Sequence, residues 1–590
     1  ATNSYNTAVG YEAGVAVTTG VQNTLIGGLA GDAITTGNNN VSLGYSSLTA
    51  NTKSHNNIAI GPFALNAFNI TTSTDGYNVA IGSVAGASVT TGINNVLIGG
   101  LAGDAITDAD SNVAVGHGSL TTNVLGSKSV AVGQGSLGDQ NPATATDMYN
   151  VGVGYNAGGA LTTGFWNTLI GALTGDALTN ANYNVAVGQA ALGADTLGSK
   201  STAVGWGSLN AQNFTTATDS LNVAVGYQAG AAVTTGIHNT LVGAGAGDAL
   251  TDADYNVAVG INALGADTLG SRSVAVGRHA LGTQNFTTAT AAHNVAVGYG
   301  AGISVTTGQL NTLIGGDAGD ALTDADKNTA VGYSALSSDT MGSQSTAIGY
   351  QALFSQNYTT ATNTRNTAVG YNAGSEVTTG TDNTLIGHET GNALTTGYNN
   401  TAVGHDALGA TDDGIENVAV GIDAGRTGSP GGNYTDGSNA MTLGDESIAN
   451  AYIQVDWTVT SDERDKTDFT ELDIGLDFVK AMKPYTFRWD KRSKYGDKKA
   501  DDYDLDAITS DGTHKEDWLD LGFKAQDVKA LEEAANYKIA DKTNLTVSIT
   551  DDGKQYGMKY AKLVPVLVKA IQEQNALIEA LTARVATLEG

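Results

Sequence analysis

The sequence has no cysteine and only 5 prolines among its 590 residues. The absence of cysteine excludes disulfide bonds and a catalytic thiol, and it leaves the redox compartment open. No apolar run approaches the roughly 18 to 20 residues of a membrane-spanning helix, so we predict no membrane insertion. Aromatic residues make up only 6% of the chain, whereas glycine occurs 78 times. This composition indicates thin, turn-rich structure with small cores.

Basic residues are scarce in the first three-quarters of the chain. Residues 1–444 hold 8 Lys and Arg against 29 Asp and Glu, whereas residues 445–590 hold 20 against 29. The net charge of −30 argues against nucleic acid or an anionic membrane as a partner, because both are bound through clustered Lys and Arg. The jump in charged residues predicts a domain boundary near residue 445.

A short motif, seen as NVAVG at Asn222–Gly226, recurs twenty-five times up to residue 444. Successive motif glycines are mostly 17, 17, 17 and 21 residues apart, and this set repeats every 72 residues. A fixed period of this kind indicates a solenoid, in which each coil buries a face against its neighbours. The Val-Ala-Val alternation is typical of a strand. At roughly 3.3 Å per strand residue, we expect two strands of about five residues per coil, and residues 1–444 are predicted to form a parallel β-roll or β-solenoid.

Each coil offers few large apolar side chains, which is little to offset the entropy of ordering its residues. We therefore predict a homo-oligomer, and we expect the small alanine between the valines, for example Ala224, to let a second subunit approach closely. The asparagine that opens most motifs, as at Asn78, Asn184 and Asn256, is predicted to form a hydrogen-bonded ladder along the coils.

The 21-residue spacings contain an insertion with a central aromatic residue, at Phe214, Phe286 and Tyr358. Insertions in a solenoid lie in loops on one edge, which is often the binding edge. An exposed aromatic ring beside Asn and Thr suits stacking on a sugar. The three residues are therefore candidate contacts with a host cell-surface receptor such as a glycan. The alternative is that the rings fold back and cover the roll.

Aspartates recur in a second pattern, as at Asp104, Asp108 and Asp110. Three carboxylates within seven residues can supply oxygen ligands to Ca²⁺. Other copies of this turn lose the later aspartates, and no turn glycine lies among them, so we favour solvated turns over metal sites. No cofactor is predicted, and these three residues are the candidates if a metal binds.

The periodicity stops after residue 444. Residues 445–460 are predicted to form one or two connecting strands, and residues 461–466 then read SDERDK. This segment resembles the S-D-x-R-x-K signature of the peptidase S74 family, the intramolecular chaperone domain of phage tail fibres and tailspikes. Further matches to that family follow at 478–489, 522–528 and 560–565.

The resemblance implies a chaperone and autoprotease domain, residues 461–562, which gathers three chains, templates a fibre and then cuts the Thr460–Ser461 bond once. Ser461 is the implied nucleophile and Lys466 the implied base, a role that requires desolvation of the lysine. Asp462, Glu463 and Arg464 are expected to support and orient the turn rather than do chemistry.

The solenoid motif itself, N-[TV]-A-[VI]-G-x-x-[AS], resembles the head repeats of trimeric autotransporter adhesins, which form a parallel β-roll in each of three chains. This second resemblance covers about three-quarters of the sequence. It implies a homotrimer in which each chain contributes one roll.

Residues 563–590 show a heptad pattern that predicts a coiled-coil helix. β-branched residues at one core position and Leu at the other favour two strands, but the family resemblance implies three, and we expect three. The pattern comprises Val564, Ile571, Ile578 and Val585 at one position and Leu567, Gln574, Leu581 and Leu588 at the other.

These features together predict a homotrimeric phage tail fibre, a host-recognition appendage of the extracellular virion tail. Its only expected enzyme activity is a single self-cleavage by a Ser-Lys dyad. One alternative is a bacterial extracellular filament or trimeric surface adhesin that retains its C-terminal cap. The other is a polysaccharide-degrading tailspike, which needs paired carboxylates in a groove, and the variable aspartates nominate no such pair.

Overall fold

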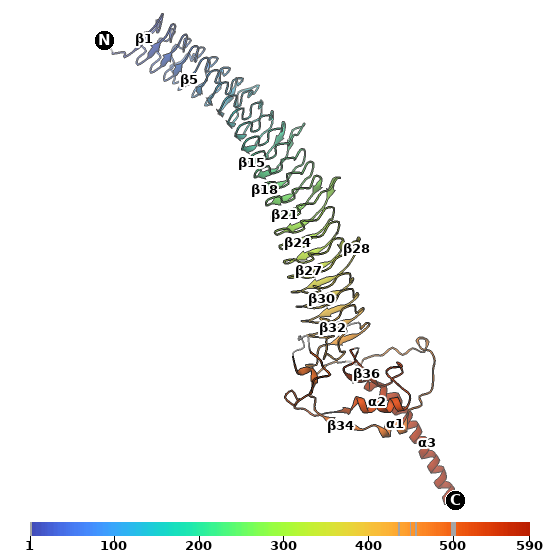
Figure 1. The fold of residues 1–590 in the computed structure, drawn as a ribbon. Coiled ribbons are helices and arrows are strands. Elements are labelled where there is room, and N and C mark those ends of the chain that lie inside the picture. Colours follow the sequence, from blue (N-terminus) through green and yellow to red (C-terminus); the bar gives the residue numbers. More distant parts are fainter. Residues whose placement is uncertain (1–2, 435–436, 449, 455–456, 497–502, 551) are drawn as a thin grey trace. The chain divides into compact units, whose positions relative to one another are not determined.

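The computed structural model describes residues 3–434, 437–448, 450–454, 457–496, 503–550 and 552–590 (Figure 1). They form two compact units, residues 1–333 and 334–590, and each is described by itself. The first unit consists of solenoid coils. The second contains further coils and then a small α+β region, residues 461–590, which we call the C-terminal region.

Each coil contributes one short strand, and coils next to the longer spacings add a two-residue strand. In the first unit the three-residue strands are β1 (Thr7–Val9), β2 (Thr24–Ile26), β3 (Val41–Leu43), β4 (Ile58–Ile60), β5 (Val79–Ile81), β6 (Val96–Ile98), β7 (Val113–Val115), β9 (Val130–Val132), β11 (Val151–Val153), β12 (Thr168–Ile170), β13 (Val185–Val187), β15 (Thr202–Val204), β17 (Val223–Val225), β18 (Thr240–Val242), β19 (Val257–Val259), β21 (Val274–Val276), β23 (Val295–Val297), β24 (Thr312–Ile314) and β25 (Thr329–Val331). Its two-residue strands are β8 (Gly126–Ser127), β10 (Thr146–Asp147), β14 (Gly198–Ser199), β16 (Thr218–Asp219), β20 (Gly270–Ser271) and β22 (Thr290–Ala291).

The coils of the second unit follow the same plan. Their strands are β26 (Gly342–Ser343), β27 (Thr346–Ile348), β28 (Thr362–Asn363), β29 (Thr367–Val369), β30 (Thr384–Ile386), β31 (Thr401–Val403), β32 (Val418–Val420) and β33 (Met441–Leu443).

Within each unit the three-residue strands pair in parallel with those of the next coil. For example, Ala224 of β17 lies opposite Ala203 on one side and Leu241 on the other. The register is the same throughout, because each motif stacks on the next. The predicted parallel β-solenoid is therefore confirmed.

The strands are shorter than expected, with three residues and one main strand per coil. The segment after the motif glycine is a series of turns, because Gln228 and Gly230 have φ angles of +53° and +60°, which a strand does not contain. The motif glycine is required for a different reason. A Cβ on Gly226, whose φ is +142°, would lie 2.4 Å from the backbone oxygen of Gly243 in the next coil.

From β2 onwards, the middle residue of each three-residue solenoid strand points into its own coil. Ala224 is 0% exposed, whereas Val223 and Val225 are half-buried on the outer face. The expectation that this alanine would let a second subunit approach is wrong. Two-residue alternation separates the two faces of a strand, but here the small residue faces a narrow interior that already holds Ala229 of the same coil.

The predicted asparagine ladder is present. Asn222 Oδ1 accepts the backbone N–H of Asn239 at 2.9 Å, and Asn239 Oδ1 accepts that of Asn256 at 3.0 Å. Each Nδ2 donates to a carbonyl of its own coil, as from Asn222 to Gly236 at 2.8 Å. These fully buried amides satisfy backbone groups that the short strands leave unpaired.

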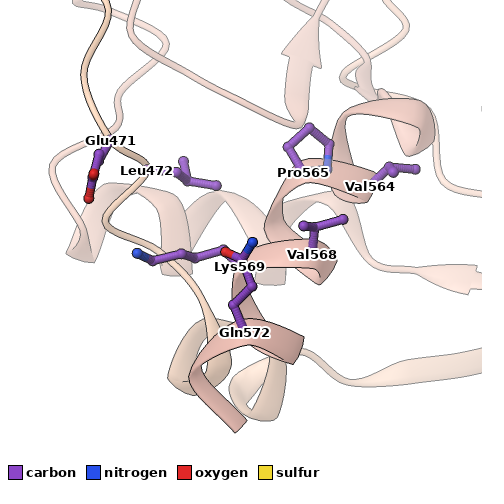
Figure 2. A pocket seen from close by; sticks show the side chains of 7 residues that line it. All are labelled: Glu471, Leu472, Val564, Pro565, Val568, Lys569 and Gln572. Atoms are coloured by element: carbon purple, nitrogen blue, oxygen red, sulfur yellow. The ribbon is translucent and has the colours of Figure 1, made fainter. Parts of the chain in front are cut away.

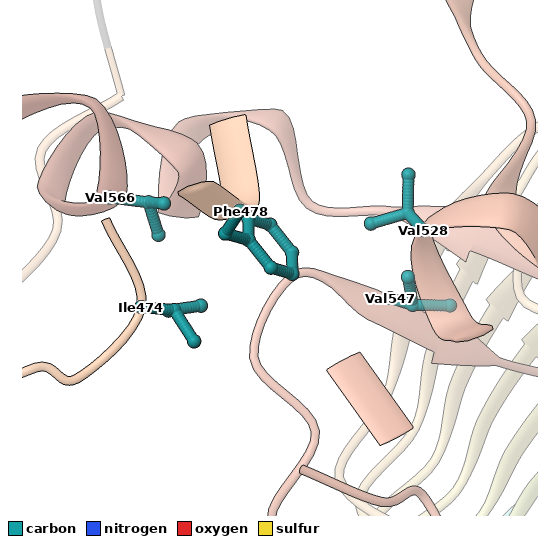
Figure 3. Close-up of a cluster of buried hydrophobic side chains, with 5 residues drawn as sticks. All are labelled: Ile474, Phe478, Val528, Val547 and Val566. Atoms are coloured by element: carbon teal, nitrogen blue, oxygen red, sulfur yellow. The ribbon is translucent and has the colours of Figure 1, made fainter. Parts of the chain in front are cut away.

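The C-terminal region packs short elements around a small core. They are η1 (Glu463–Asp465), α1 (Leu476–Ala481), β34 (Pro484–Phe487), η2 (Arg492–Lys494), β35 (Asp520–Phe523), α2 (Ala525–Ala534), β36 (Val547–Ile549), β37 (Tyr556–Met558), η3 (Tyr560–Lys562) and α3 (Leu563–Glu589). β34 pairs antiparallel with β35, and β36 with β37. Figure 3 shows the core, in which α1, α2, β36, α3 and the segment before α1 bring together Ile474, Phe478, Val528, Val547 and Val566.

The segment between solenoid and C-terminal region differs from its prediction. Ala449, Val455 and Asp456 lie outside the described residues, and the remaining described residues of 445–460 form no strand. Asp445 and Glu446 at its start are buried, but Tyr452 is 93% exposed, so the later part of this segment packs against little within the chain. Among the residues that the structure describes, no helix is long and apolar enough to cross a membrane.

Candidate functional site

Ser461 and Lys466 meet at the start of the C-terminal region. Lys466 Nζ lies 2.5 Å from Ser461 Oγ and 3.2 Å from the backbone oxygen of the same residue. A serine hydroxyl within hydrogen-bond reach of an amine is the arrangement that a Ser-Lys nucleophile and base require. The structure thus brings together the two residues that the sequence nominated.

The turn η1 between them sets this geometry. Asp462 caps it, since its Oδ1 accepts the backbone N–H of Arg464 at 2.9 Å. The backbone N–H of Lys466 donates to the Glu463 carbonyl at 3.1 Å, which turns the lysine back over Ser461.

Arg464 holds the capping residue from its other side. Its Nη2 lies 2.6 Å from Asp462 Oδ2, and this hydrogen bond lowers the pKa of the Asp462 carboxyl. An exposed ion pair contributes little to stability. Its role here is to orient the turn.

Thr460, Ser461 and Lys466 are exposed in the single chain. A lysine acts as a base where water is excluded around its amine. The described part of one chain supplies the nucleophile–base geometry but leaves the base in solvent. Catalysis by this pair would require further surface to cover the turn.

Phe214, Phe286 and Tyr358 are not exposed as the receptor-contact hypothesis requires. Their exposed fractions are 6%, 4% and 8%, and the Tyr358 hydroxyl donates to the Gly380 carbonyl at 2.7 Å. The rings close the wider coils from inside. In one chain they occupy the alternative position, folded back over the roll.

A buried carboxylate lies beneath each of these rings, and the sequence reasoning missed it. Asp195 Oδ1 accepts the backbone N–H groups of Gly198 and Phe214 at 3.0 and 3.2 Å, and Oδ2 accepts Gln212 Nε2 at 2.6 Å. Burial raises the pKa of Asp195. The signal was the 72-residue period, because Asp267 with Gln284 and Asp339 with Gln356 repeat the pair.

The candidate metal ligands hold neighbouring coils together instead. Asp104 Oδ1 accepts the Thr121 hydroxyl at 2.6 Å, and Asp110 Oδ1 accepts the backbone N–H of Ile93 at 2.7 Å. Asp108 accepts the Thr91 hydroxyl. Each carboxylate thus serves as a hydrogen-bond acceptor for an adjacent coil.

One other group in the described part of the chain has metal-ligand chemistry, namely His405, Asp406 and Asp423. Arg426 Nη1 lies 3.2 Å from Asp406 Oδ2 and 3.8 Å from Asp423 Oδ1. The guanidinium already places a cation between these carboxylates. This cluster is therefore better explained as an ion-pair network.

Comparison with known families identifies the first part of the C-terminal region. Residues 461–537 match the Peptidase_S74 model, described as chaperone of endosialidase. This segment is an S74 chaperone domain. The match begins at Ser461, and the S74 domain runs through η1, α1, β34, β35 and α2. Neither a curated protein nor a solved structure matches the chain.

The family resemblance inferred from the sequence is thereby confirmed for residues 461–537. The solenoid precedes an S74 domain, which is an arrangement consistent with a tail fibre or tailspike that carries a C-terminal chaperone.

Proposed function

We propose that the protein is a homotrimeric tail fibre, a host-recognition appendage of a phage virion, whose S74 domain promotes assembly and then cuts the Thr460–Ser461 bond. The observation that carries the proposal is the contact between Lys466 Nζ and Ser461 Oγ at the first residue of the S74 match. The solenoid supplies the fibre, and its acidic composition suits a solvated exterior.

The outer face of the solenoid supports the trimer. The third residue of each three-residue solenoid strand, as at Val225, is Val, Ile or Leu, and these side chains form an aliphatic stripe that continues from coil to coil within each unit. The first residue is aliphatic in some coils, as at Val223, and Thr in others. Members such as Ile170 and Ile314 are more than a third exposed. A contiguous apolar patch of this extent marks a protein–protein interface, and copies of the same stripe are its matched partners.

Helix α3 carries a second apolar surface. Leu567, Ile571, Ile578 and Leu581 are all exposed, at the spacing of a coiled-coil core. An open groove of about 510 Å³ lies beside its first turns (Figure 2), and both features suit two further copies of the helix. The groove is lined by Glu471, Leu472, Val564, Pro565, Val568, Lys569 and Gln572.

The proposed cleavage is an attack by Ser461 on its own preceding bond. Lys466 Nζ takes the hydroxyl proton, Ser461 Oγ bonds to the carbonyl carbon of Thr460, and the peptide nitrogen leaves with a proton. Water then hydrolyses the Thr460 ester. The products are a Thr460 carboxylate and a chain that begins at Ser461 with its hydroxyl restored.

Because Lys466 is exposed in one chain, we expect assembly to come before cleavage. If neighbouring chains cover the turn in the trimer, they exclude water from the amine and activate it. Cleavage then follows assembly. A coiled coil that gathers three C-termini also raises the local concentration of the chains. This helps the solenoid coils of the three chains to align, because contacts between residues far apart in sequence form slowly.

The test is a denaturing gel with mass spectrometry of the expressed chain beside Ser461→Ala and Lys466→Ala. The unsubstituted chain should give pieces of 460 and 130 residues, the second beginning at Ser461, and both variants should stay whole. Lys480→Ala is the matched control, because this exposed lysine pairs with Asp477 and not with Ser461. If all four chains stay whole, self-cleavage is refuted, and a filament or surface adhesin with a permanent cap becomes the better account.

A further inference from the structure

The last solenoid coil lies directly against the C-terminal region at two glycines. A Cβ added to Gly428 would lie 2.6 Å from the Cβ of Ser493, and one added to Gly432 would lie 2.6 Å from the Cβ of Thr550. Neither position leaves room for a side chain. The backbone of the coil is therefore in close contact with both partners.

Two hydrogen bonds accompany this contact. Lys491 Nζ donates to the backbone oxygen of Glu446 at 2.6 Å, and the backbone N–H of Asn433 donates to Asp552 Oδ2 at 3.3 Å. We call these residues, together with Gly428, Gly432, Ser493 and Thr550, the docking contact.

The docking contact is well covered. Glu446 is 8% exposed and Ser493 is 3% exposed. Burial, with the nearby charge of Glu446, raises the pKa of Tyr503. A hydrogen bond from a charged lysine to a backbone carbonyl is stronger than one between neutral groups, and this one is partly buried.

The two sides of the contact lie on opposite sides of the scissile bond. The coil side ends at Glu446, and the other side begins at Lys491, well beyond Ser461. The intervening linker contributes little, since Tyr452 and Val459 are largely exposed. Cutting the chain at Thr460–Ser461 removes none of the atoms that form the contact.

We propose that the C-terminal region stays bound to the last coil through the docking contact after the chain is cut, as a noncovalent end cap of the solenoid. A solenoid needs capping where its stack ends, and β33 is the last strand of the described stack. Release is then a separate step from cleavage. The inference takes only the position of the cut from the proposed function.

The experiment supplies the cut independently of the dyad. A recognition sequence for a site-specific protease is inserted between Tyr452 and Ile453 of the full-length Ser461→Ala chain. The digested protein is then passed over a size-exclusion column in low salt. The two pieces should co-elute. If they elute apart, the proposal is overturned, whatever the result of the self-cleavage test.

Two substitutions test the contact itself in the same protein. Lys491→Ala removes the donor to Glu446, and Ser493→Trp fills the space against Gly428. Together they should release at least ten times more of the C-terminal piece. Lys494→Ala is the matched control, because Lys494 and Lys491 both approach Glu516, at 3.5 and 3.8 Å, but only Lys491 reaches the coil. Equal retention in the double variant and the control would overturn the assignment.

A further measurement uses the Ser461→Ala chain with the protease site but without the two contact substitutions. Its result does not depend on whether the double variant folds. Hydrogen exchange of the Asn433 amide is followed before and after digestion. The amide should stay protected after the cut, because Asp552 still accepts its hydrogen bond. A tenfold or greater rise in exchange on digestion would contradict the proposal.

Discussion

The solenoid and the C-terminal region stabilise their folded structures in different ways. A solenoid coil buries only a few small or aliphatic side chains, such as Ala224 and Val233, and buried amides such as Asn222 hydrogen-bond it to the next coil. The C-terminal region has a conventional core around Phe478. Both nevertheless expose an ordered apolar stripe, on the strands in one case and on α3 in the other. One copy of the chain therefore forms all of these elements, but it leaves the apolar side chains of both stripes exposed.

The largest effect should come from a comparison of two substitutions in the C-terminal region, one in its buried core and one on the exposed apolar stripe of α3. Phe478→Ala should cost about 3–5 kcal/mol, because it empties a buried site, and should abolish assembly by unfolding the region. Ile571→Ala removes a side chain that is 63% exposed. It should leave the fold of one chain intact but weaken association. Circular dichroism with size-exclusion chromatography checks both, and equal loss of fold in the two variants would contradict the distinction.

The next effect concerns coil stacking. Gly226→Ala puts a Cβ 2.4 Å from the next coil at a strained φ, and it should cost about 3 kcal/mol or more. Gly512→Ala is the control, because Gly512 also has a positive φ, of +91°, but no atom lies within 4 Å of its added Cβ. Thermal unfolding measures the difference. Similar shifts for the two variants would show that stacking does not require this glycine.

The smallest effect is a pH dependence confined to the wider coils. Burial raises the pKa of Asp195, Asp267 and Asp339. Their contribution to stability is therefore full below the unfolded pKa of about 3.9, and it is lost as the pH rises through the raised folded values.

Replacing all three aspartates with Asn should flatten this decline in the thermal midpoint as the pH rises above the unfolded pKa of about 3.9. The equivalent positions of an earlier coil are Asn123 and Gln140, and the buried Asn123 still accepts the backbone N–H of Gly126, which shows that the fold accepts an amide there. An unchanged slope in the triple variant would show that other groups dominate the pH response.

The sequence predicted the architecture because repetition makes one local solution recur. The 72-residue period indicated the parallel stack, and the asparagine at each strand start indicated the ladder. The SDERDK segment placed Ser461 and Lys466 five residues apart, and the tight turn η1 makes that spacing a contact.

The sequence was a poorer guide to which side chains face the interior of a coil. Alternation at Val223-Ala224-Val225 defines two faces but not which one is the interior. For Phe214 the sequence left an exposed and a folded-back ring both open, and the structure has the folded-back one, in a coil widened by four residues. The Asp195–Gln212 pair joins residues in adjacent coils, so no local pattern announces it. The segment 445–460 has strand-like composition but, in its described residues, no strand to pair with.

The central claim is that three copies of the chain associate and bury the apolar stripes that one copy leaves exposed. The most direct test is multi-angle light scattering of the full-length Ser461→Ala protein, which keeps every chain whole. The account predicts a native mass three times the 59.8 kDa of one chain. A folded particle with the mass of one chain at micromolar concentration would contradict it.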